Sequence, residues 1–179
     1  MEMSIVARAR AFAEDRHRGQ TRKDGAGTPY AAHLEEVACL VARFGGGEAA
    51  VTAAWLHDTV EDCPPTSLDE IGAAFGPVVR RIVAEVTDDK ALAKAERKRL
   101  QVIRAPSKSA EAALVKLCDK ISNVRSVGAT PPVDWPLARR RAYLDWAEAV
   151  VAGLRHLPAE ARAAFAATLG AARARLDGR

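Results

Sequence analysis

The chain has 179 residues, enough for one domain with a sizeable core and too few for two ordinary ones. Its three cysteines are odd in number and widely spaced, which argues against a disulfide framework and against a cysteine zinc site. The formal net charge of +4 suits an anionic ligand, but there is no arginine tract and no RNA-binding aromatic signature, so we expect no nucleic-acid partner.

No apolar run reaches membrane-spanning length, and residues 1–3 lead directly into an amphipathic segment instead of a signal peptide. We therefore expect a cytoplasmic protein with no membrane partner. Alanine is frequent, and glycine and proline cluster between periodic segments. These features predict an all-α fold class, a helical bundle of about eight to ten helices with no significant sheet, in a single domain over residues 1–179.

In chain order, apolar periodicity predicts a first helix over residues 4–18, which Gly19 ends before a polar loop. Thr28 is the expected N-cap, and Pro29 the first turn, of a second helix over residues 30–44. The third helix, residues 48–60, is apolar on nearly every side and should be the buried central helix.

Further along, Ser67 and Glu70 form a capping box for a short helix that ends at Phe75-Gly76, and Pro77 begins the next helix. Residues 87–110 are strongly charged, which favours an exposed helix or flap. Three more helices are predicted to complete the chain, over residues 108–125, 136–157 and 158–177.

The third predicted helix ends in the stretch Trp55-Leu56-His57-Asp58-Thr59-Val60-Glu61-Asp62. On a continuous helix, residues four apart share a face, so His57 would lie below Glu61 and Asp58 below Asp62. Core packing does not require two such polar columns. An adjacent histidine and aspartate can hold one metal ion between them, with the second pair reaching water and substrate. The stretch therefore predicts a metal site, which needs further ligands elsewhere.

Two residues can supply them. Asp119 lies in an apolar helical stretch, where burying a carboxylate is costly unless it is paired or coordinated, and His33 lies in the first turn of the second helix. Two imidazoles and two carboxylates suit Mn²⁺, Fe²⁺, Co²⁺ or Zn²⁺. Each residue alone has a simpler explanation: a helix-end His-Asp pair, a polar helix start, or an ion pair of Asp119 with a neighbouring lysine. His17 and His156 are interpreted as structural.

The chain also carries a longer series of motifs in unbroken order over roughly residues 5–155. They are Gly19-Gln20, Arg22-Lys23, Gly27-Thr28-Pro29-Tyr30 with His33, Leu56–Asp62, Phe75-Gly76, Val86–Lys90, Glu96–Val102 and Lys116–Arg125. This series resembles the HD-type hydrolase domain of the RelA/SpoT family, and most closely the stand-alone small alarmone hydrolases, including the metazoan SpoT homologue.

The resemblance implies an HD-domain helical bundle that binds one Mn²⁺ ion, with other divalent metals as alternatives. It implies hydrolysis of guanosine 3′,5′-bis(diphosphate) and its pentaphosphate form at the 3′ position. The implied metal ligands are His33, His57, Asp58 and Asp119. The implied catalytic residues are Glu61, Asp62 and Asn123. The implied substrate-binding residues are Arg22, Lys23, Trp135, Arg139 and Tyr143.

Two positions depart from the family pattern. Ser122 stands where relatives usually have tyrosine or histidine, and Leu34 stands where proline is common, so Ser122 is expected to loosen or reshape the pocket. Other interpretations stay open: a different nucleotide substrate, such as an adenosine alarmone or NADPH, or a nucleotide-binding regulator without catalysis. From the residues alone, Arg22 and Lys23 could be a solvated basic loop, and Trp135 and Tyr143 could be core aromatics.

Overall fold

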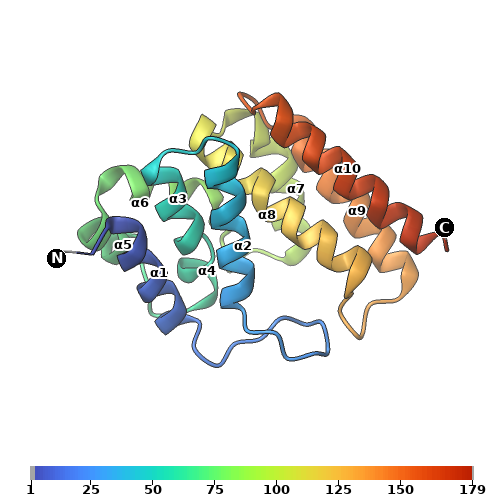
Figure 1. Cartoon of the computed structure of the whole chain (residues 1–179), viewed down its shortest axis with the longest axis horizontal. Helices are drawn as coiled ribbons and strands as arrows, with labels where there is room; N and C mark the ends of the chain where they lie inside the picture. The colour runs from blue at the N-terminus through green and yellow to red at the C-terminus, as the bar shows by residue number, and fades with distance from the viewer. Residues whose placement is uncertain (1–2, 179) are drawn as a thin grey trace.

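A computed structural model describes residues 3–178; Met1, Glu2 and Arg179, which the single-domain prediction includes, lie outside the described residues. Within residues 3–178 the regular structure is helical with no strand, and an isolated bridge joins Thr21 to Pro29. The predicted all-α fold class is confirmed. The elements, labelled in Figure 1, are α1 (Ile5–Arg16), α2 (Ala31–Arg43), α3 (Glu48–Leu56), α4 (Thr59–Asp62), α5 (Leu68–Phe75), α6 (Pro77–Val86), α7 (Lys94–Arg104), the 3-10 turn η1 (Ala105–Ser107), α8 (Ala110–Ala129), α9 (Leu137–Gly153) and α10 (Ala159–Leu176).

Serine hydroxyl groups cap the N-termini of several of these helices. Ser4 accepts a hydrogen bond from the Ala7 amide, and Ser67 accepts one from the Glu70 amide, both at 3.2 Å. The predicted start of α5 is therefore confirmed. Ser109 caps α8 in the same way, which sets the start of that helix two residues later than predicted. Each hydroxyl satisfies a backbone donor that has no partner inside its helix.

The central helix is α8, which packs against α2, α3, α6, α9 and α10. Helix α3, which was predicted to be the buried central helix, is buried from Thr52 to Leu56 and packs against α8, but α8 holds the central position. Figure 1 shows α1–α6 on one side of the molecule and α9 and α10 on the other, with α8 running between them. Because α8 touches both groups, a side chain on its inner face can meet residues from α2 and α3.

The prediction of one continuous helix over residues 48–60 is wrong. Helix α3 ends at Leu56, His57 and Asp58 form a turn, and α4 begins at Thr59. The hydroxyl group of Thr59 donates to the Leu56 carbonyl at 2.7 Å, so a side chain supplies a bond that the helix backbone would otherwise make. The two predicted columns of polar side chains therefore do not form on one straight helix, and His57 and Asp58 face the core at the break.

Other helix boundaries also differ from prediction. Thr28 does not cap α2: its carbonyl accepts from the Arg22 amide at 2.8 Å in a loop that precedes the helix. Helix α9 ends at Gly153 instead of residue 157, and the side chain of Arg162 donates to the carbonyl of Leu154 just beyond its end. Helix α8 continues to Ala129, four residues past its predicted end. No helix within residues 3–178 has the length and apolar character needed to cross a membrane.

Helices α8 and α10 approach closely at Gly128, where an added Cβ atom would lie 2.8 Å from the Cα atom of Ala172. We expect Gly128→Ala to lower the free energy of unfolding by about 1–3 kcal/mol, because a methyl group there forces the helices apart. Urea unfolding followed by circular dichroism measures this change. Gly170→Ala on α10 is the matched control, since an added Cβ there meets no atom of residues 3–178 within 4 Å. An equal loss in both variants would contradict the close-approach argument.

Candidate active site

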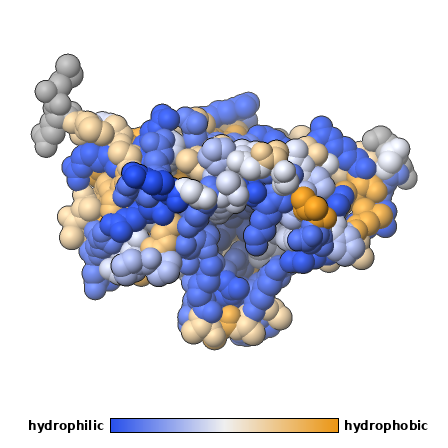
Figure 2. Space-filling view, turned by 90° about the horizontal axis from the view of Figure 1, so that it is seen from below, coloured by the Kyte–Doolittle hydropathy of each residue, from blue (hydrophilic) through white to orange (hydrophobic). Residues whose placement is uncertain are grey.

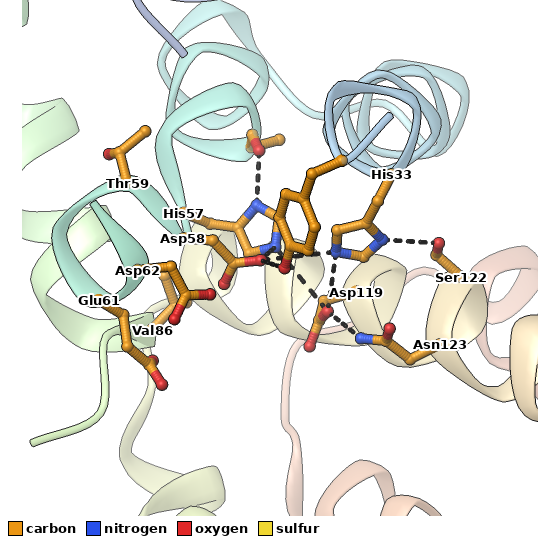
Figure 3. Close-up of polar contacts among 12 residues, drawn as sticks. His33, His57, Asp58, Thr59, Glu61, Asp62, Val86, Asp119, Ser122 and Asn123 are labelled. Atoms are coloured by element: carbon orange, nitrogen blue, oxygen red, sulfur yellow. Dashed lines mark hydrogen bonds and ion pairs between the residues drawn. The ribbon is translucent and has the colours of Figure 1, made fainter. Parts of the chain in front are cut away.

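The four predicted metal ligands meet between α2, the α3–α4 turn and α8, as Figure 3 shows. His57 Nε2 lies 3.1 Å and His33 Nε2 lies 3.7 Å from Asp58 Oδ2. From Asp119 Oδ1, His33 Nε2 is 3.5 Å away and His57 Nε2 is 3.8 Å away. Two imidazole nitrogens and two carboxylate oxygens thus face one small volume, although they come from three separate parts of the sequence.

The bonding of each imidazole leaves its Nε2 atom available. His57 Nδ1 lies 2.7 Å from the Ala54 carbonyl, which can only accept, so Nδ1 carries a proton. His33 Nδ1 lies 2.8 Å from the Ser122 hydroxyl. Both Nε2 atoms are buried, and within residues 3–178 neither has a hydrogen-bond partner. One ligand atom from each of His33, His57 and Asp58 fits within a 4.8 Å group. These residues fit a divalent metal ion, whose ligands are unprotonated imidazole nitrogens and carboxylate oxygens.

The electrostatics of the cluster also favour a cation. Burial lowers the pKa of His57, but the charges of Asp58 and Asp119 outweigh burial and raise that pKa to about 10. Burial and the nearby His57 lower the pKa of His33. Although burial opposes ionisation of Asp58, the charge of His57 lowers its pKa. The two carboxylates therefore favour a positive charge between them, which a proton on His57 or a divalent cation can provide.

Tyr30 is a site residue that the sequence analysis did not single out. Its hydroxyl group donates a hydrogen bond of 2.6 Å to Asp58 Oδ2, the oxygen that faces both histidines. Its ring stacks on His17 with a centroid distance of 4.8 Å. Burial and the charge of Asp58 raise the pKa of Tyr30, which keeps the hydroxyl protonated as a donor. The signal in the sequence was its place in the Gly27-Thr28-Pro29-Tyr30 motif.

Two neighbours on α8 donate hydrogen bonds to Asp119, and Arg22 supports one of them. Asn123 Nδ2 donates to Asp119 Oδ1 at 2.5 Å, and Arg22 donates to the side-chain oxygen of Asn123, Oδ1, at 3.2 Å. Lys120 donates to the other oxygen, Asp119 Oδ2, at 3.1 Å. The lysine pairing proposed as a simpler explanation therefore does occur, together with the approach of Asp119 to His33 and His57. Lys120 was not predicted as a site residue, and its signal was a lysine in an apolar helical stretch.

The predicted catalytic carboxylates lie on α4 beside this cluster (Figure 3). Glu61 Oε2 accepts from the backbone amide of Asp88 at 3.1 Å, and Glu61 Oε1 lies 3.5 Å from Arg97. Asp62 pairs with Lys90 at 2.5 Å. Burial, together with neighbouring carboxylates, raises the pKa of Glu61. The two carboxylates therefore contact Asp88 and Lys90 in the loop after α6 and Arg97 on α7, instead of the four candidate ligands.

A cavity of about 260 Å³ lies next to the cluster, with Tyr30 and Asn123 between the two. Four of the five predicted substrate residues line it: Arg22, Lys23, Trp135 and Tyr143. The fifth, Arg139, lines an adjoining cavity of about 230 Å³, which shares Trp135 and Tyr143 and adds basic side chains that were not predicted, namely Lys94, Arg97 and Lys98. Figure 2 shows the face below the view of Figure 1 hollowed near its centre, with a largely hydrophilic rim.

Both predicted aromatic residues are half-buried and pack against the apolar core, with 5.5 Å between the ring centroids of Trp135 and Tyr143. They therefore serve the core and also line the cavities. Ser122 is not among the residues that line the 260 Å³ cavity beside Asn123. Its side chain points to His33 Nδ1 and Glu36 instead. Figure 3 shows Ser122 on the side of the His33 ring that is away from Nε2.

Comparisons with known proteins agree with this geometry. Residues 9–147 match the HD domain family. The chain is 48% identical over 155 residues to human guanosine-3′,5′-bis(diphosphate) 3′-pyrophosphohydrolase MESH1, covering 86% of each chain. It is 42% identical over 146 residues to the Drosophila melanogaster MESH1 protein, covering 80% of this chain and 81% of the relative.

A solved structure described as "A metazoan ortholog of SpoT hydrolyzes ppGpp and plays a role in starvation responses" superimposes with a TM-score of 0.89 at 37% identity. The match covers 95% of this chain and 96% of that one. The fold and the histidine-aspartate cluster define an HD-domain protein. Within that class, the chain belongs to the family of the MESH1 proteins, so the predicted resemblance is confirmed.

Proposed function

We propose that this protein hydrolyses guanosine 3′,5′-bis(diphosphate) and its pentaphosphate form at the 3′ position, releasing pyrophosphate with GDP or GTP. The observation that carries the proposal is the pair of buried imidazole Nε2 atoms, both without a hydrogen-bond partner in residues 3–178, that face two carboxylates beside a cavity to which Arg22 and Lys23 contribute. The names of the MESH1 relatives and of the superimposed structure support the same substrate.

His33, His57, Asp58 and Asp119 would hold one divalent cation, for which we propose Mn²⁺, with other divalent metals as alternatives. The ion would neutralise charge on the phosphoryl oxygens and lower the pKa of water. Tyr30 and Asn123 would keep the two ligand carboxylates in place through the hydrogen bonds that they donate to Asp58 and Asp119. Held carboxylates keep their oxygens aimed at one point, which metal binding needs.

Glu61 and Asp62 would accept and pass on the proton of the attacking water. The raised pKa of Glu61 suits this role, because a base works best when its pKa approaches the working pH. Such a base contributes roughly a hundredfold or more in rate. In this structure Arg97 forms an ion pair with Glu61, and Lys90 forms one with Asp62. A negatively charged substrate could bind Arg97 and Lys90 itself, either together with the two carboxylates or in their place.

Arg22 and Lys23 would bind a diphosphate group as positive partners, and Arg22 would also place Asn123. Trp135 and Tyr143 would bind the nucleoside between the basic groups of the two cavities, with Arg139 beside Trp135 at 4.4 Å from its ring centroid. Stacking on an aromatic ring serves guanine and adenine alike, so adenosine alarmones or NADPH would be the competing substrates.

Product analysis by ion-exchange chromatography tests this function. We expect purified protein with Mn²⁺ to convert guanosine 3′,5′-bis(diphosphate) to GDP and pyrophosphate, because a metal ion held by the cluster would promote hydrolysis of the phosphate ester. The activity should be lost with a chelator and should return when Mn²⁺ is added back. Cleavage of NADPH or an adenosine alarmone instead, with the guanosine compound left intact, would overturn the substrate. Binding of these nucleotides without turnover would favour a regulator.

A further inference from the structure

We infer that Ser122 and Glu36 are positioning residues that fix His33 as a metal ligand. They lie behind the imidazole, on the side away from the cluster. The inference rests on the proposed metal-dependent function and deepens it, because it says how this chain prepares one of the ligands. Neither residue belongs to the set of site residues that the family resemblance implies.

Three groups form a continuous chain of hydrogen bonds between α2 and α8. The Ser122 hydroxyl lies 2.8 Å from His33 Nδ1 and 2.5 Å from Glu36 Oε2. The other oxygen of Glu36 accepts from Arg125. His33 and Ser122 are only 3% and 2% exposed, so water does not compete for their bonds. The side chain of Glu36 is 30% exposed and that of its partner Arg125 is 51% exposed, so this series of hydrogen bonds reaches the protein surface at Arg125.

The direction of these bonds follows from the chemistry of the groups. An ionised carboxylate can only accept, so the single hydroxyl proton of Ser122 goes to Glu36. The oxygen of Ser122 must then accept a proton from His33 Nδ1. A neutral imidazole with its proton on Nδ1 has its lone pair on Nε2, which faces Asp58 and Asp119. Glu36 therefore determines, through Ser122, that His33 presents a lone pair to a metal ion.

The second histidine of the cluster shows why this arrangement matters. His57 Nδ1 donates to the backbone carbonyl of Ala54, an acceptor that no side-chain substitution removes. His33 has no such backbone acceptor; its Nδ1 partner is a hydroxyl group, which can either donate or accept. Without Glu36, Ser122 could donate to Nδ1 and drive the proton to Nε2. Partners of this kind orient metal-binding histidines and raise the affinity of the site.

Glu36→Gln is the sharpest test, because the new amide group can donate to Ser122 and so reverse both hydrogen bonds. We expect ¹⁵N NMR of the metal-free protein at pH 8 to show His33 protonated on Nδ1 in the wild type. Glu36→Gln should move that proton toward Nε2. Calorimetry with Mn²⁺ alone should show affinity lowered by roughly 10–100-fold in Glu36→Gln and in Ser122→Ala. Ser122→Thr keeps the hydroxyl group and should bind Mn²⁺ as the wild type does.

Glu35→Gln is the matched control, since the neighbouring glutamate is half-exposed and pairs with Arg10 instead of Ser122. It should change neither the His33 proton nor the Mn²⁺ affinity. Unchanged Nδ1 protonation and unchanged affinity in both Glu36→Gln and Ser122→Ala would overturn the inference. If those variants shift as expected while the wild type leaves guanosine 3′,5′-bis(diphosphate) intact, the positioning role stands and the proposed substrate fails.

Discussion

His57→Ala is expected to lower the hydrolysis rate by on the order of 10³-fold or more and to remove tight Mn²⁺ binding. His57 Nε2 lies within 4 Å of both carboxylates of the cluster, at 3.1 Å and 3.8 Å, so its removal takes away one of the four proposed ligands. Alanine leaves Asp58 and Asp119 with the imidazole of His33 alone between them. A lost ligand cannot be replaced by His33, which already occupies its own side of the cluster.

Rate assays with guanosine 3′,5′-bis(diphosphate) and calorimetric titration with Mn²⁺ measure the two effects. His17→Ala is the matched control, because His17 is also 3% exposed but does not face the two carboxylates. It should retain one Mn²⁺ ion per chain. Circular dichroism checks that the His57 variant is folded. Retention of wild-type Mn²⁺ affinity in a folded His57→Ala protein would remove the metal site as proposed here.

The fold could be predicted largely from local signals. Apolar periodicity located the helices, and Ser67 and Pro77 marked the starts of α5 and α6. The break at His57 and Asp58 could not be read in this way, because no glycine or proline marks it in the sequence. It depends on a competition within the turn, where the Thr59 hydroxyl bonds to the Leu56 carbonyl. Such a competition is decided by packing around the turn.

The candidate site shows the same division. His33, His57, Asp58 and Asp119 were chosen from chemistry and from family resemblance, and their side chains do converge. Of the residues that hold them, Asn123 was predicted as a catalytic residue, whereas Tyr30 and Lys120 were not predicted. Tyr30 appeared in the sequence only as part of the Gly27-Thr28-Pro29-Tyr30 motif, and its bond to Asp58 exists only once α2 meets the α3–α4 turn. Ser122 was expected to reshape the pocket, but its contact with His33 depends on how α2 and α8 face each other.

Lys120→Met is expected to destabilise the metal-free protein by about 3–5 kcal/mol, because it leaves the Asp119 carboxylate buried without its nearest positive partner. The Lys120 ammonium lies 3.1 Å from Asp119 Oδ2, and the lysine is only 3% exposed. Although burial opposes ionisation of Asp119, the charge of Lys120 is foremost among the effects that lower its pKa. Methionine keeps most of the side-chain volume, so the loss reports charge and not packing.

Lys98→Met separates this effect from the contact with Trp146. Both lysines lie over that ring, Lys98 at 4.5 Å and Lys120 at 4.4 Å from its centroid, but Lys120 pairs with Asp119. Losing the aromatic contact alone should cost about 0.5–1 kcal/mol. Urea unfolding with a chelator and again with saturating Mn²⁺ measures both variants. Equal losses in the two would contradict the charge argument.

The stabilisation of each protein by Mn²⁺ tests whether Asp119 is a metal ligand. A cation held by Asp119 supplies the positive charge that Lys120→Met removes. In the variant, the Lys120 ammonium is also no longer present to repel that cation. Ligand binding stabilises the folded state in proportion to the logarithm of its affinity. Saturating Mn²⁺ should therefore stabilise Lys120→Met more than it stabilises the wild type, and it should stabilise Lys98→Met no more than the wild type. Since the expected difference arises only if Asp119 is a ligand, an equal gain in all three proteins would place the cation away from Asp119.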